Sequence, residues 1–95
     1  MHRHTVLFNL NDDADEAAVM AAMKGLADLP TVESMVIGEN IVPMGDISPY
    51  KWLLIGDFAD QDARDAYENH QDHVDVIKNT FLPNAKDFIV SDVNF

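Results

Sequence analysis

Two groups of side chains in this sequence have the chemistry of a proton-transfer site. His2 and His4 stand near the start of the chain, and Tyr67, His70 and His73 follow one another at three-residue intervals. A histidine exchanges protons at neutral pH because its ordinary pKa is about 6.5. A tyrosine hydroxyl beside it can donate a hydrogen bond to a carbonyl oxygen that gains negative charge. Such a pair suits proton abstraction next to a carbonyl, as in aldol-type ring closure, enolisation or lyase chemistry.

Backbone geometry decides which of these residues can meet. His2 and His4 share one face of a strand, because alternate strand residues point the same way. Tyr67 and His70 share one face of a helix. His73 leaves the inward stripe of a straight helix, so it turns inward only if the helix breaks near Gln71 and Asp72. We expect Asp72 to be the N-cap of the helix that follows such a break.

The same residues allow two other interpretations. Tyr67 can simply pack a helix on a sheet, with His4 and His70 satisfied by backbone carbonyls at the edge of the core, and spacing alone favours this structural role. The histidines of either group, with a nearby aspartate, are ligand types that suit zinc or nickel. No third ligand lies at metal-site spacing, and no phosphate loop or dinucleotide fingerprint is present. We therefore expect no metal and no other cofactor.

Apolar periodicity predicts the elements that position these residues. Strands are expected at Thr5 to Leu10, Thr31 to Val42, Tyr50 to Phe58, and Phe88 to Phe95. A helix capped by Asp12 or Asp13 carries apolar Val19, Met20, Met23, Leu26 and Ala27. A second helical stripe contains Ala63, Ala66, Tyr67, His70, Val74, Ile77 and Phe81, and Leu82-Pro83-Asn84 closes it. Gly38 and Asn40 suggest a bulge or bend, and residues 43–49 are expected to form a loop with proline at both ends.

The order strand–helix–strand–strand–helix–strand predicts an α+β, ferredoxin-like protomer with a four-stranded antiparallel sheet. Residues 1–95 are expected to form a single domain. Six basic and seventeen acidic residues give a net charge of −11, which disfavours nucleic acid and anionic membrane surfaces as partners. No secretory signal is visible and no run approaches the ~18 apolar residues that a membrane span needs, so a cytoplasmic location is expected.

The predicted sheet is apolar on both faces, although both helical segments must lie on the same side. The face that the helices leave open carries Leu7, Leu53, Ile55, Ile89 and Val93. Burying each would stabilise by at most ~1.5–3 kcal/mol, and monomeric proteins rarely expose a large apolar patch. We expect a homodimer through this sheet face. In the alternative, a monomer, the loop at 43–49 would shield it.

Three segments carry a resemblance to a known family: RHTVLFNL at the start, YKWLLIGDFADQDARDAYENHQDHVDVI in the centre, and KDFIVSDVNF at the end. They resemble the Dabb, or stress-responsive A/B barrel, family, including its olivetolic acid cyclase-like members. The central Tyr-x-x-His-x-x-His segment after an apolar strand is the most specific part. One departure is Gln71, which stands where the family usually has a proline that breaks the helix. The resemblance implies a dimeric α+β barrel, in many members with a cavity between sheet and helices.

The resemblance also implies roles for individual residues. Tyr67 and His73 correspond to the catalytic pair of a cofactor-free polyketide cyclase, with His4 as a pocket histidine. The expected ligand-binding residues are Val6, Phe8, Trp52, Leu54 and His70. The favoured function is a pocket that binds or converts an aromatic or polyketide-like carbonyl compound. The alternatives are a non-enzymatic stress-responsive dimer and, third, a cofactor-independent monooxygenase.

Overall fold

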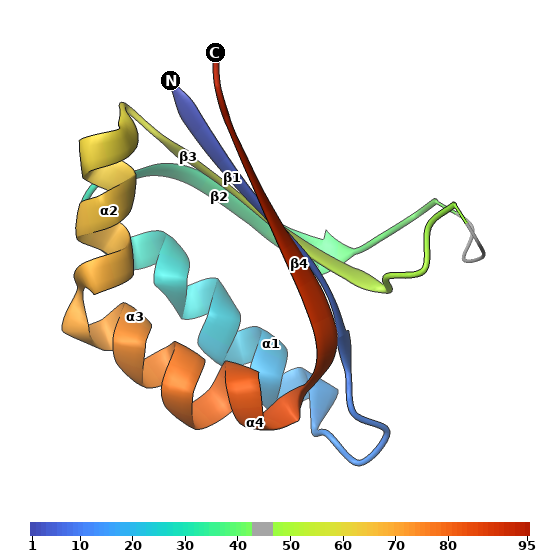
Figure 1. The fold of residues 1–95 in the computed structure, drawn as a ribbon. Helices are drawn as coiled ribbons and strands as arrows, with labels where there is room; N and C mark the ends of the chain where they lie inside the picture. Colours follow the sequence, from blue (N-terminus) through green and yellow to red (C-terminus); the bar gives the residue numbers. More distant parts are fainter. Residues whose placement is uncertain (43–46) are drawn as a thin grey trace.

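The computed structural model describes residues 1–42 and 47–95, which form one antiparallel sheet with helices packed on one face (Figure 1). The strand order is β2-β3-β1-β4, as predicted for a ferredoxin-like protomer. The strands are β1 (His2–Leu10), β2 (Val32–Glu39), β3 (Trp52–Phe58) and β4 (Ala85–Asn94). The helices are α1 (Glu16–Lys24), η1 (Gly25–Asp28), α2 (Gln61–Asn69), α3 (Gln71–Val76), η2 (Ile77–Phe81) and α4 (Leu82–Asn84). Residues 43–46 of the predicted loop lie outside the described residues.

The two central strands separate an inner from an outer face as the alternation predicts. Even-numbered residues of β1, from His2 to Leu10, are buried beneath the helices. Beside them on β3 lie Leu54 and Phe58, which are also buried. On the outer face Leu7 pairs with both Leu53 and Ile89. Helices cover only the inner face among the described residues, so the outer face stays open (Figure 1).

Three of the strands, β1, β2 and β4, differ from the sequence prediction in their ends or register. β1 begins at His2 rather than Thr5, because the His2 and His4 side chains bond to β4. β4 begins at Ala85, directly after the last helix. Of the bulge or bend predicted at Gly38 and Asn40, the bulge is absent, since Gly38 pairs with Leu53 in regular register, and β2 ends at Glu39. The irregularity of β2 lies at its other end, between Val32 and Ser34.

The first helix begins two to three residues later than predicted. Asp15 is its N-cap, and the Asp15 Oδ1 atom accepts from the Ala18 N–H at 3.1 Å. The prediction of Asp12 or Asp13 as the cap is wrong, because the chain is still turning out of β1 at these residues. Val19, Met23 and Leu26 then reach the core on one side of the helix. Among residues 1–42 and 47–95, no helix is long and apolar enough to cross a membrane.

The second helical region is bent rather than straight. It breaks at His70, whose backbone is extended with φ −63° and ψ 136°. The His70 Nδ1 atom accepts from the Asp72 N–H at 3.1 Å, so His70 caps α3. The predicted cap at Asp72 is therefore wrong, although the predicted break is present. Leu82 to Asn84 form the last helical turn, and the helical region closes there as predicted.

Candidate functional site

A small cavity lies between the sheet and the second helical region. It has a volume of about 160 Å³. Its polar lining comes from His4, Tyr67, Glu68 and His73, and the rest is apolar, including Val6 and Leu54. Phe88 and Val90 of β4 line it too, although these side chains are 43% and 50% exposed, so the cavity reaches solvent along this edge strand. A dry cavity of about 150 Å³ can hold a benzene molecule, which sets the scale of a ligand here.

Tyr67 and His73 form the centre of this lining. Their ring centroids are 4.5 Å apart, and Phe58 lies on Tyr67 at 5.0 Å. The His73 Nδ1 atom is 3.0 Å from the Glu68 carbonyl oxygen, which can only accept, so we assign the proton to Nδ1. The His73 Nε2 atom then keeps a free lone pair. The break at His70 brings His73 to the cavity although the residue after His70 is Gln71 and not a proline.

Burial shifts the pKa of both residues toward the neutral form. The Tyr67 side chain is 1% exposed, and loss of solvation raises the pKa of its hydroxyl far above the ordinary value. Burial is also the largest influence on His73 and lowers its pKa, with nearby His4 and Arg64 acting in the same direction. The hydrogen bond to the Glu68 carbonyl opposes this shift without cancelling it. At neutral pH the pair is therefore an uncharged imidazole beside an uncharged phenol.

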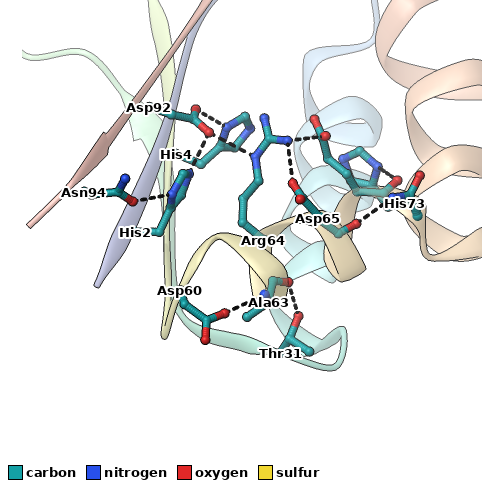
Figure 2. Close-up of polar contacts among 12 residues, drawn as sticks. His2, His4, Thr31, Asp60, Ala63, Arg64, Asp65, His73, Asp92 and Asn94 are labelled. Carbon is teal, nitrogen blue, oxygen red and sulfur yellow. Dashed lines mark hydrogen bonds and ion pairs between the residues drawn. The ribbon is translucent and has the colours of Figure 1, made fainter.

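His4 reaches the cavity from the sheet side and is held by a carboxylate. The His4 Nδ1 atom lies 2.7 Å from the Asp92 Oδ1 atom, across the β1–β4 pairing (Figure 2). The other carboxylate oxygen, Oδ2, lies 2.8 Å from the His2 Nε2 atom. The His2 Nδ1 atom is 2.8 Å from the Asn94 side-chain oxygen. One carboxylate thus orients both strand histidines.

Arg64 of α2 joins this group from the helix layer. Its Nε atom lies 3.0 Å from the Asp92 Oδ2 atom, and its guanidinium also pairs with Glu68 and Asp65 (Figure 2). The Nε–H is not aligned for a hydrogen bond to any of the described residues. A second, polar cleft of about 370 Å³ opens beside His2, Arg64 and Asp92. The charged group therefore stands between an apolar cavity and a polar cleft.

The pKa directions within the group follow from this sharing. The hydrogen bond to Asp92 is the main cause that raises the pKa of His2, against a smaller effect of burial. For Asp92, partial burial acts upward, but the hydrogen bonds from His2 and His4 outweigh it and lower the pKa. Asp92 is therefore ionised at neutral pH, and His2 is protonated to a greater extent than a free histidine at the same pH.

The structure brings together some of the predicted site residues and separates others. His4, Val6, Leu54, Tyr67 and His73 line the cavity. Phe8 is fully buried under Phe81, with ring centroids 5.3 Å apart, and Trp52 lies at the start of β3 beside Lys51. His70 caps α3 at the surface. Phe8, Trp52 and His70 are absent from the cavity lining among the described residues.

The sequence pattern placed His2 and His4 together on one strand face, but it did not identify Asp92 or Arg64 as their partners. A signal for Asp92 was available, because antiparallel pairing of the first and last strands sets His2 opposite Asn94 and His4 opposite Asp92. Both strands alternate, so all four side chains share the inner face. Arg64 has no comparable signal, since an arginine on a predicted amphipathic helix usually points to solvent.

Comparison with known proteins agrees with this fold. A Dabb family protein with a ferredoxin-like fold from Mesorhizobium loti is similar, with TM-score 0.86, 28% identity, and coverage of 99% of this chain and 95% of that one. A dimeric ferredoxin-like protein of unknown function from Thermobifida fusca has TM-score 0.83 and 22% identity, with 99% and 90% covered. The hydroxynitrile lyase from Passiflora edulis has TM-score 0.84 and 12% identity, with 97% and 90% covered. No curated protein matches the sequence.

The sheet order and the one-sided helix layer define a ferredoxin-like α+β protein. The model of the Stress responsive A/B Barrel Domain family, Dabb, matches residues 3–95. The chain belongs to the Dabb family.

Proposed function

We propose that the chain binds a small carbonyl compound in the cavity between sheet and helices and transfers a proton to or from it. The observation that carries this proposal is the convergence of His4, Tyr67 and His73 on one apolar cavity. The volume of about 160 Å³ favours a single-ring or short-chain compound over an extended polyketide. The expected class is an aryl alkyl ketone or another small carbonyl compound that has a C–H bond on the carbon beside the carbonyl.

The roles follow from the protonation states. His73 Nε2 is an unprotonated base, and its lowered pKa keeps it neutral at pH 7. When it takes a proton from the carbon beside a carbonyl, the C–H electron pair forms the C=C bond of an enolate. The carbonyl oxygen then carries the negative charge, and the Tyr67 hydroxyl donates a hydrogen bond to it. The proposed activity is a cofactor-free lyase or cyclase type of acid–base catalysis.

Deuterium exchange into acetophenone tests this proposal. The protein in D₂O should accelerate loss of the methyl proton signal, followed by NMR. Tyr67→Phe and His73→Gln should each reduce the rate, by about 10- to 1,000-fold, because each removes one acid–base or oxyanion contact. His70→Asn is the matched control, since asparagine also caps helices and His70 lies outside the cavity lining. Exchange that is equal in all variants would refute the assignment.

We also propose that two copies associate through the open sheet face. Val36, Ile89 and Val93 are 64%, 47% and 56% exposed on it, and the described helices leave it uncovered. The similar Thermobifida fusca protein is described as dimeric. The second candidate function is a non-enzymatic dimer, and the open sheet face is the one observation that favours it. In that case the protein should not accelerate deuterium exchange into any ketone. A cytoplasmic location remains a prediction from the sequence.

A further inference from the structure

We infer that Asp92 is a positioning residue that fixes the tautomer of His4, so that His4 presents an unprotonated Nε2 to the cavity. The inference deepens the proposed function and rests on it for its chemical meaning. It starts from one contact, the 2.7 Å approach of His4 Nδ1 to the Asp92 Oδ1 atom. An ionised carboxylate only accepts hydrogen bonds, so the proton on a neutral His4 must be on Nδ1.

The surroundings keep Asp92 in the ionised form and in place. The His2 ring nitrogens lie 2.8 Å from an Asp92 oxygen and 2.8 Å from the Asn94 side-chain oxygen. Both oxygens can accept a hydrogen bond, so they favour the protonated form of His2, in line with its raised pKa. Arg64 adds a second positive charge 3.0 Å from the same carboxylate. Asp92 is thus held from three sides, by His2, His4 and Arg64.

The consequence for the cavity is a pair of basic nitrogens from opposite walls. The Glu68 carbonyl holds the proton of His73 on Nδ1, and Asp92 does the same for His4. Both residues line the cavity, one from α3 and one from β1. A ligand with a hydroxyl group can therefore donate to either side, whereas the Tyr67 hydroxyl can donate to the ligand's carbonyl. The site is built for a compound that carries or acquires both groups, such as a hydroxy ketone or an aldehyde adduct.

The first test is the tautomer of His4, read by long-range ¹H–¹⁵N NMR at pH 8.5 on the full chain. The wild type should show Nδ1–H. Asp92→Asn should keep this tautomer, because the asparagine oxygen can still accept from Nδ1. Asp92→Ala should make Nε2–H the major form. Asp87→Ala is the control: it removes a carboxylate of β4 that accepts from Asn9 and not from a histidine, so the tautomer of His4 should not change.

The second test is the binding of phenol and toluene, which differ in the hydroxyl group. Asp92→Ala should weaken phenol binding about fivefold, the equivalent of one neutral hydrogen bond, and leave toluene unchanged. Asp92→Asn should stay within twofold for both. Equal weakening of phenol and toluene would assign Asp92 a purely structural role and overturn the inference.

The role of Asp92 and the proposed function of the cavity are refuted by different results. An Nε2–H tautomer in the wild type, or an unchanged tautomer in Asp92→Ala, overturns the role of Asp92 whatever the cavity binds. The wild-type measurement needs no variant, so it decides the question even if Asp92→Ala does not fold. Absence of binding for both phenol and toluene, with Nδ1–H present on His4, would instead refute the proposed function.

Discussion

The open face of the sheet makes a quantitative prediction about association. Ile89 lies on this face in the edge strand β4, opposite Leu7 of β1, and Leu7 in turn pairs with Leu53 of β3. The Ile89 side chain is 47% exposed in the single chain. Complete burial of an isoleucine stabilises by about 1.5–3 kcal/mol, so the exposed half corresponds to about 0.7–1.4 kcal/mol. Truncation to alanine forfeits most of this amount in each copy.

A twofold interface contains the residue twice. Ile89→Ala should therefore weaken the dimer by about 1–2 kcal/mol, which raises the dissociation constant about 5- to 30-fold. Sedimentation equilibrium across a concentration series measures this constant directly. Val74→Ala is the control, because Val74 is 40% exposed on α3, in the helix layer. A dissociation constant for Ile89→Ala within twofold of the wild type would refute the reasoning, as would a monomeric wild type at high micromolar concentration.

Three further changes test the interior. Tyr67→Ala should lower the free energy of unfolding by about 3–5 kcal/mol in urea titrations, because Tyr67 is only 1% exposed. Tyr67→Phe keeps the ring and should stay within about 1 kcal/mol of the wild type. Similar losses in the two variants would contradict the packing role of the ring. Gly56→Val should destabilise by about 1–3 kcal/mol, because a Cβ there already meets the Met35 Cε at 3.0 Å and the Phe58 ring at 3.3 Å, and an unchanged melting temperature would argue against this contact. His2→Gln should destabilise most below about pH 6.5 and progressively less as the pH rises through the raised pKa of His2, because a group with a raised folded-state pKa stabilises only while protonated. Denaturation at pH 5.5 and 8.5 measures this difference, and a larger effect at pH 8.5 would contradict the sign.

The fold was predictable because its pattern is local and strong. Alternation along β1 and β3 assigns Val6 and Leu54 to the buried face and Leu7 and Leu53 to the open one, and the register agrees. Element ends were less predictable, because tertiary contacts set them. β1 extends to His2, where its backbone pairs with Phe58 and Asn94 and the ring of His2 bonds to the Asp92 and Asn94 side chains.

The site was predictable in part for the same reason. Tyr67 and His4 follow from helix and strand periodicity, but the position of His73 depends on a break that no proline announces. The break comes from His70, whose own ring caps the next helix, a role that usually falls to serine, threonine, aspartate or asparagine. Trp52 was expected near Leu54 because they share a strand face, yet it lies too far along β3 to reach the cavity lining. Face can be inferred from spacing, whereas depth along an element cannot.

Intermolecular NOEs between acetophenone and the protein test the central claim most directly, because they locate the ligand without requiring turnover. The account predicts contacts from the ligand methyl and ring protons to the ring protons of His4, Tyr67 and His73. Contacts confined to the open sheet face around Leu7 and Ile89, or none at millimolar ligand, would contradict it.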